Sequence, residues 1–450
     1  MRSRNLIILM AVVAALGAFI FFVERHQPTT LEVVKRANRV FPDLDVNVVE
    51  AVELQTSQGP IRLAAVNKEW RLVEPIDFPA DAAAVRSLLG AIADLDAERV
   101  LPLGEVELAD FGLDDAVLGV VLLDSEGTRF SLAVGDPTPL GSNRAVRRGS
   151  DEEIVMSTGA FVAGLDRGVD DWRSRDVVDL LEHDLDSVEI ETAEDQIRAE
   201  RVNGRWQLEA PLVDLADRDQ MQSLISELNT LRISEFLPGD GDPAELGLDP
   251  PAFRVLLEPR NGDPILTLEF SASEEGAQTI VCRRNGVDLF RVSNSIGIRL
   301  SKAPVLWRSD EVWPFSSWDV ATAEFANTAE EIVVREADGL WQVDDGSEAD
   351  SGEIRRRLTA LADLVVREHD LTLPPTEVMG SVILVLDNDQ GAEGLTYTFY
   401  APMEEGGLAA VTVSTRADVM GIDAVTVETI LEDLDRLRPV EESDPGSEVS

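Results

Sequence analysis

Three histidines are the residues of this chain best suited to acid–base chemistry near neutral pH: His26, His183 and His369. His183 and His369 each lie between a glutamate and an aspartate, and these two contexts fall at unrelated positions of the internal repeat described below. A lone histidine beside carboxylates is usually a solvated surface residue. We therefore predict that no histidine is catalytic.

Two acidic loops are the only features of the sequence that suggest a metal site. Residues 239–242 read Gly-Asp-Gly-Asp, and residues 387–391 read Asp-Asn-Asp-Gln-Gly. The second loop has glycine at its fifth position and lacks the glutamate that a calcium loop needs at its twelfth. Ordinary turns account for both loops, so we predict no metal site.

Other catalytic signatures are absent from the sequence. The single cysteine, Cys282, lies in an alternating apolar run, which predicts a small buried strand residue rather than a reactive thiol. The chain has no G-x-S-x-G, H-E-x-x-H, C-x-x-C or Walker motif. We expect no catalytic, cofactor-binding or metal-binding residues and no cofactor. With 85 aspartates and glutamates, a carboxylate pair that hydrolyses glycans remains an alternative.

A tandem repeat organises the chain. The same tryptophan-bearing phrase begins at Trp70, Trp206 and Trp341, at spacings of 136 and then 135 positions. A second phrase, Trp-Arg-Ser, begins at Trp172 and returns at Trp307 with the same spacing of 135. A unit of this length can bury its own core, unlike a short solenoid repeat. The sequence therefore predicts three related domains.

Each repeat begins with alternating strands and continues into an amphipathic helix. Aspartates at 81, 217 and 350 precede the three helices and are expected to cap them, and Gln220 and Glu353 are placed to complete capping boxes. The repeated tryptophans are interpreted as core residues, with a stacking platform for a ligand as the alternative. One main helix and a shorter one among six or seven strands predict an α+β fold with a mostly antiparallel sheet.

The N-terminus carries an apolar run of 18 residues, Leu6 to Val23, preceded by Arg2 and Arg4. As a helix of about 27 Å it could span a bilayer. The positive charges would keep the N-terminus in the cytoplasm and the bulk of the chain outside. A cleavable signal peptide is the alternative, but bulky residues end the run and no small-x-small cleavage site follows. We expect a single-pass protein of the cytoplasmic membrane.

Charge narrows the range of partners. The formal net charge is −46, and such a surface repels nucleic acid and anionic lipid headgroups. We expect no nucleic-acid partner, and membrane attachment only through the N-terminal helix. The segments expected from these patterns are 1–5 (cytoplasmic N-terminus), 6–23 (transmembrane anchor), 24–44 (tether), 45–180, 181–316 and 317–440 (repeat domains, the third divergent) and 441–450 (disordered acidic tail).

Several short phrases occur together in one order. They are W-R-L-x-x-P at 70–75, F-G-L-D at 111–114, V-G-D at 134–136 and D-D-W-R-S-R at 170–175. Together with the N-terminal run they resemble the domain-of-unknown-function 4340 (DUF4340) family, over roughly residues 45–315. The third repeat departs from this pattern, because Leu-Thr-Leu-Pro-Pro at 371–375 replaces Gly-Leu-Asp.

The resemblance implies a membrane-anchored bacterial protein associated with ABC-type transport systems like those of gliding motility. It implies an extracytoplasmic accessory protein whose partners are permease or auxiliary subunits, and it supplies no catalytic or ligand residues. A carboxylate-dependent envelope hydrolase and a passive spacer remain the alternatives.

Overall fold

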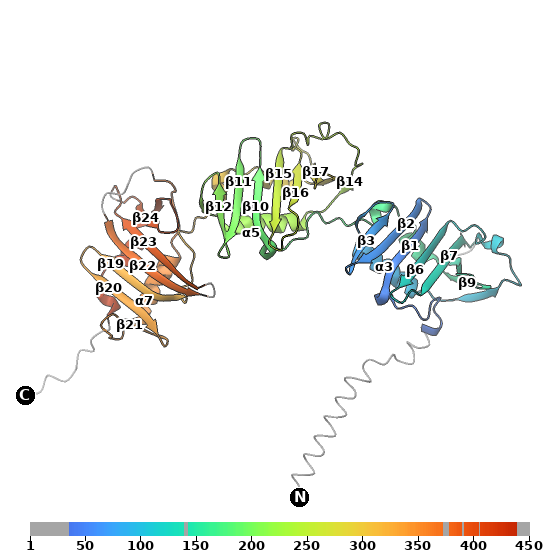
Figure 1. The fold of residues 1–450 in the computed structure, drawn as a ribbon, viewed down its shortest axis with the longest axis horizontal. Coiled ribbons are helices and arrows are strands. Elements are labelled where there is room, and N and C mark those ends of the chain that lie inside the picture. Colours follow the sequence, from blue (N-terminus) through green and yellow to red (C-terminus); the bar gives the residue numbers. More distant parts are fainter. Residues whose placement is uncertain (1–35, 139–142, 372–377, 389–390, 405, 439–450) are drawn as a thin grey trace, which may run out of the picture. The chain divides into compact units, whose positions relative to one another are not determined.

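The computed structural model describes residues 36–138, 143–371, 378–388, 391–404 and 406–438 (Figure 1). These residues form three sheets in which every strand pairing is antiparallel. Their contacts divide the chain into two compact units, one ending at Arg175 and one beginning at Asp176. The first unit holds one sheet and the second holds two, so the fold is α+β with mostly antiparallel sheets.

The first sheet has nine strands in the order β4-β3-β2-β1-β6-β7-β8-β9-β5. Consecutive strands form hairpins, except that β5 returns from the main helix to the far edge beside β9. The strands are β1 (Val49–Thr56), β2 (Gly59–Val66), β3 (Glu69–Glu74), β4 (Phe78–Pro79), β5 (Arg99–Pro102), β6 (Leu118–Asp124), β7 (Arg129–Pro137), β8 (Asn143–Arg148) and β9 (Glu153–Thr158).

The second sheet repeats this order strand for strand, as β13-β12-β11-β10-β15-β16-β17-β18-β14. The shared order is the structural counterpart of the sequence repeat. The strands are β10 (Leu185–Glu191), β11 (Gln196–Val202), β12 (Arg205–Ala210), β13 (Asp214–Leu215), β14 (Glu235–Phe236), β15 (Phe253–Pro259), β16 (Leu266–Phe270), β17 (Thr279–Arg284) and β18 (Asp288–Ser293).

The third sheet keeps the seven central strands in the order β21-β20-β19-β22-β23-β24-β25. Single bridges, Gln342 with Glu348 and Glu368 with Gly421, stand where the other sheets have edge strands. The strands are β19 (Val320–Asn327), β20 (Glu331–Ala337), β21 (Leu340–Val343), β22 (Val378–Asn388), β23 (Gly391–Tyr400), β24 (Ala409–Val413) and β25 (Met420–Ile422). The expected six or seven strands is thus correct here and too low for the first two sheets.

One main helix packs on each sheet, and a shorter helix follows near the end of each repeat. The main helices are α3 (Ala82–Ala93), α5 (Arg218–Thr230) and α7 (Ser351–Ala362), and the shorter ones are α4 (Val162–Leu165), α6 (Ser295–Leu300) and α8 (Ala424–Leu431). The 3-10 turns are η2 (Val46–Val48), η3 (Leu108–Phe111), η4 (Gly159–Phe161), η5 (Val169–Asp171), η6 (Glu182–Asp184), η7 (Pro304–Trp307) and η8 (Leu434–Leu437).

The aspartate caps are confirmed. Asp81 accepts hydrogen bonds from two first-turn N–H groups of α3, Asp217 from Gln220 N at 2.8 Å, and Asp350 from two N–H groups of α7. The capping boxes are wrong, because the cap N–H groups donate elsewhere. Asp217 N donates to Trp307 O at 2.8 Å, and Asp350 N donates to Leu437 O at 3.0 Å. The last turn of each repeat therefore closes back onto the start of its own main helix.

The repeated tryptophans differ in burial. Trp206 and Trp341 are buried core residues, as predicted. Trp70 is only partly buried and packs at the margin of the first core. Cys282 is a fully buried strand residue of β17, as predicted, and burial raises the pKa of its thiol.

The N-terminal segments need one correction. The tether was expected to extend to residue 44, but Val40, Phe41 and Leu44 are buried in the first core. The predicted span Leu6–Val23 and the acidic tail lie outside the described residues. Within the described part of the chain, no helix is long and apolar enough to cross a membrane. The boundaries expected between the repeats remain predictions.

Candidate functional site

The end of the second repeat brings a charged side chain into the interior of the second unit. Trp307 ends η7 and is fully buried, and the next two residues pair with the segment that precedes α5. Arg308 bridges to Ala216, and Ser309 N donates to Leu215 O at 2.9 Å. This pairing places the Arg308 side chain beside Asp214, the first residue of β13.

Asp214 is the carboxylate on which two arginines converge. Its Oδ2 accepts a hydrogen bond from Arg308 Nε at 2.7 Å, and its Oδ1 accepts one from Arg416 Nε at 2.6 Å. Arg416 follows β24 of the third repeat, and its Nη1 also donates to the carbonyls of Glu311 and Val312 at 2.6 and 3.2 Å. The contact thus joins the edge of the second sheet to the loops of the third.

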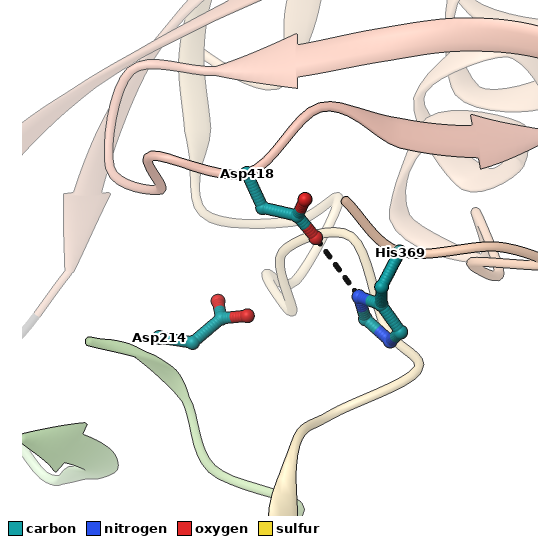
Figure 2. A group of neighbouring side chains, drawn as sticks. All are labelled: Asp214, His369 and Asp418. Carbon is teal, nitrogen blue, oxygen red and sulfur yellow. Dashed lines mark hydrogen bonds and ion pairs between the residues drawn. The ribbon is translucent and has the colours of Figure 1, made fainter. Parts of the chain in front are cut away.

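Asp418, two residues beyond Arg416, is the second buried carboxylate. Its Oδ2 accepts from Arg308 Nη2 at 2.8 Å and lies 2.9 Å from His369 Nδ1, as Figure 2 shows for the histidine. Its Oδ1 accepts from the backbone N–H of Asp370 at 2.8 Å. Because an ionised carboxylate can only accept hydrogen bonds, His369 donates through Nδ1.

We call Asp214, Arg308, His369, Arg416 and Asp418 the junction network. The side chains of the two aspartates and two arginines are at most 4% exposed. Two guanidinium groups balance two carboxylates, and buried charges of this kind require such pairing. The network is therefore closed within the chain.

The surroundings shift the pKa of two members of the junction network. Burial raises the pKa of the Asp418 carboxyl, but the hydrogen bond from His369, the N–H of Asp370 and the charge of Arg308 outweigh burial and hold that pKa below its ordinary value. Burial lowers the pKa of Arg308, but the carboxylates of Asp370, Asp214 and Asp418 outweigh it and raise that pKa. Both shifts favour the charged forms.

A metal ion does not fit this donor set. Candidate ligand atoms of Asp214, His369 and Asp418 lie within 4.8 Å of one another, the one such group among the described residues. Every oxygen of the two carboxylates, however, already accepts at least one hydrogen bond from an arginine or a backbone N–H. A cation would have to displace Arg308, the side chain that contacts both carboxylates. The group is better described as an ion-pair network.

The histidine and aspartate pair could orient a general base, but no nucleophile accompanies it. His369 Nε2 lies 3.4 Å from Asp310 Oδ1, a carboxylate that is 74% exposed. Among the described residues, His369 has carboxylates as its only hydrogen-bond partners. Nucleophilic catalysis needs a hydroxyl or thiol within reach of the base. The arrangement instead positions a loop of the third repeat.

The sequence prediction for the histidines is half correct. His183 is 73% exposed, as expected of a solvated residue, and His26 lies outside the described residues. His369 departs from the prediction, because its side chain is only 16% exposed and contacts Asp418. Its partner lies 49 positions further along the chain, so the neighbouring acidic residues in the sequence gave no sign of this pairing.

The first repeat shows which signal could have revealed the network. The Trp-Arg-Ser phrase there places Arg173 over the ring of Phe78, at 4.2 Å from the ring centroid. Phe78 begins β4 and Asp214 begins β13, the same strand of the shared order. The first repeat thus has the aromatic Phe78 opposite its arginine, and the second repeat has the carboxylate of Asp214 opposite the equivalent Arg308. This difference between the repeats marks Asp214 as unusual.

The first of the two acidic loops forms a turn, as predicted, and the prediction for the second loop remains untested. In the loop 239–242, Asp242 Oδ1 accepts from Ala244 N at 3.0 Å, a local turn contact. In the second loop, Asp387 and Asn388 are the last two residues of the long strand β22, and Asp389 lies outside the described residues.

Comparison with known families gives one match. Residues 70–251 match the family described as Domain of unknown function (DUF4340). The match begins at Trp70 in the first sheet. It ends at residue 251, beyond α5 and β14 of the second repeat and just before β15, so it covers parts of two repeats. Neither the curated proteins nor the solved structures include a significant match. This match agrees with the family resemblance that the sequence phrases indicate.

Proposed function

We propose that this protein is a non-catalytic accessory protein, anchored in the cytoplasmic membrane with its repeats outside, that binds subunits of an ABC-type transport system. One observation carries the non-catalytic part of the proposal. The histidine and carboxylates that lie together in the described residues satisfy one another and two arginines, leaving no free acid, base or nucleophile there.

The junction network also suits a binding role. Asp214 and Arg308 of the network belong to the second repeat, and His369, Arg416 and Asp418 belong to the third. Removing one partner of a buried ion pair costs about 3–5 kcal/mol. A network of this kind favours one fixed arrangement of the second and third sheets. A protein that presents surfaces to a partner benefits from such rigidity, because less ordering is needed on binding.

The membrane location rests on the sequence of the N-terminus. Arg2 and Arg4 before the run Leu6–Val23 favour an uncleaved anchor with the N-terminus inside. An anchor confines the repeats to the membrane surface and raises their effective concentration for a neighbour in the same membrane. Modest intrinsic affinity for a permease subunit would then be sufficient.

Crosslinking in native membranes tests the function. The full chain carrying a photoreactive side chain should crosslink to ABC permease or auxiliary subunits. Replacing residues 1–23 with a cleavable signal should reduce crosslinking while the repeats still fold. Crosslinking that does not depend on the anchor would contradict the proposed role of the membrane.

Hydrolysis assays address the enzyme alternative. The purified full chain should release no product from peptidoglycan or other envelope glycans. If product is released and Asp418→Asn or Asp214→Asn abolishes its release without unfolding the protein, the hydrolase alternative is correct. Absence of any crosslinked partner would leave the protein as a passive spacer and contradict the proposal.

A further inference from the structure

The three repeats allow one surface position to be compared three times within the same chain. The position lies beside the repeated tryptophan, between the 3-10 turn that precedes the first long strand and the start of the main helix. Strand register fixes the equivalent residues: Trp70 pairs with Ala65, Trp206 with Arg201 and Trp341 with Glu336.

In the second repeat the chain fills this position with its own carboxylate. Glu182 begins η6, and its Oε1 accepts a hydrogen bond from Trp206 Nε1 at 3.2 Å. Arg201 lies over the Trp206 ring at 5.5 Å, donates to Glu182 O at 2.9 Å and lies 3.7 Å from its carboxylate. An indole N–H and a cation thus hold a carboxylate here.

In the third repeat the cation at the start of the main helix has an aromatic partner. Trp318 lies two residues before β19, and the guanidinium of Arg355 lies 3.7 Å from its ring centroid. Arg355 directly follows Ile354, the first buried residue of α7. The cation at the start of this helix therefore has a partner within the chain, although Trp318 itself is 76% exposed.

In the first repeat the same position is open. Val46 stands in place of Glu182, and Ala65 stands in place of Arg201. Both residues line a hollow of about 740 Å³, together with Trp70, Lys68 and Arg86. A hollow of this volume lies in the range of ligand-binding pockets.

The hollow is lined by two cations, Lys68 and Arg86, and by one carboxylate, Glu50, and neither cation forms an ion pair among the described residues. Neither cation forms a hydrogen bond there, although the chain has a formal charge of −46. Arg86 directly follows Val85, the first buried residue of α3, and so corresponds to Arg355. Unpaired cations beside an indole are the chemistry that binds a carboxylate.

Lys68 occupies a strained backbone position. It lies in the turn between β2 and β3 with φ of +72°, where the corresponding turns of the other repeats have Gly204 and Gly339. A non-glycine residue is strained in this conformation, because its Cβ lies too close to the following carbonyl oxygen. Strain of this kind persists at functional sites more than elsewhere. The first repeat therefore carries a lysine where the other two repeats carry glycine.

We propose that this hollow binds an acidic side chain of a partner protein, whose carboxylate lies between the Trp70 indole N–H and the cations Lys68 and Arg86. The partner would supply the group that Glu182 supplies within the second repeat. This inference rests on the proposed binding function and names the chemistry of one contact. Lys68 and Arg86 are exposed, so a side chain that protrudes from another protein can reach them.

A peptide that copies residues 179–185 of this chain, which contain Glu182, is a direct probe. Labelled peptide should bind the purified full chain in detergent micelles, with binding measured by fluorescence anisotropy. The same peptide with Glu182→Gln should bind at least about tenfold more weakly, because it loses a charge-assisted hydrogen bond. Equal binding of the two peptides would overturn the proposal.

Two variants of the protein separate binding from folding. Val46→Glu with Ala65→Arg should fill the hollow as in the second repeat and abolish peptide binding without lowering the melting temperature. Lys68→Gly should weaken binding severalfold and leave the fold intact or more stable, because glycine accepts the positive φ. Arg129→Gln removes another exposed cation of the same sheet and should not change binding.

Two further outcomes show whether this binding site fails while the proposed function stands. If sodium benzoate displaces the peptide at an equal concentration, the site takes free organic acids and the partner assignment is wrong. If the Val46→Glu, Ala65→Arg protein still crosslinks to membrane subunits at wild-type yield, the partner binds elsewhere, and this proposal fails while the proposed function stands.

Discussion

Arg308 is the residue on which the junction network depends. It contacts Asp214, Asp418 and Asp370, and the first two of these carboxylates are buried. Loss of one partner would leave a buried charge without compensation, which costs more than the pair itself contributes. Each buried aspartate is therefore expected to matter far more than the exposed carboxylates beside it.

The substitution Asp418→Asn should destabilise the protein by about 3 kcal/mol at neutral pH, because it leaves Arg308 and His369 short of an anionic partner. Wild-type stability should also fall in acid. The folded-state pKa of Asp418 is lowered, so its contribution is complete above the ordinary aspartate value of 3.8 and is lost as pH falls through the lower folded value. Urea unfolding across pH 2–7 measures both effects.

Asp310→Asn is the matched control, because Asp310 contacts the other ring nitrogen of His369, Nε2. The Asp310 side chain is 74% exposed, so its contact with His369 should contribute less than about 1 kcal/mol. Equal destabilisation by Asp310→Asn and Asp418→Asn would contradict the assignment of the buried network.

The repeated tryptophans permit a second comparison between residues. Trp206→Ala should cost about 3–5 kcal/mol, because Trp206 is only 4% exposed and fills the second core. Trp70→Ala should cost clearly less, because Trp70 packs only partly against the first core. Thermal unfolding of the two variants measures the difference. A larger loss for Trp70→Ala would mean that its ring is a core anchor.

At the scale of elements, the sequence predicted the features that depend on residues close together in the chain, namely the amphipathic helices and their caps. The predicted amphipathic helices are present as α3, α5 and α7, each with a buried apolar face, and the capping aspartates act as expected. The short edge strands β4 and β5 were missed, because two to four residues carry no readable alternation. The capping boxes were wrong because a distant carbonyl, Trp307 O, competes for the cap N–H.

The cap of α5 gives a prediction for this scale. Asp217→Ala should destabilise the protein by about 1 kcal/mol through loss of the hydrogen bond to Gln220 N. Asp217→Asn retains an accepting oxygen and should cost only a few tenths of that amount. Chemical denaturation of both variants tests the cap, and equal losses would show that the charge, not the hydrogen bond, stabilises the helix.

At the scale of the molecule, the second and third sheets belong to one compact unit whose contacts include the junction network. Sequence could predict the repeat but not this association. Asp214 and Arg416 lie 202 positions apart, and no motif joins them. Only the comparison of Phe78 with Asp214 indicates this association in the sequence. The repeated arginine contacts an aromatic ring in the first repeat and a carboxylate in the second.

Proteolysis should report on this association. The Arg308 side chain is 4% exposed, so trypsin should cut slowly after it in the native protein. Asp214→Asn should raise the cleavage rate at that bond at least about tenfold, because local opening becomes more favourable. Asp370→Asn removes an exposed contact with the same arginine and should change the rate little. Equal rates in all three proteins would contradict a role of Asp214 in holding the segment closed.

The exchange of Phe78 for Asp214 limits how the chain can be shortened or rearranged. A chain in which the first repeat was fused directly to the third would present Phe78 to Arg416, a side chain with no solvent exposure whose carboxylate partner is Asp214. A buried guanidinium would then lack its anion. The repeats share one strand order but are not interchangeable modules, because the second repeat carries at this position the carboxylate that Arg416 of the third repeat requires.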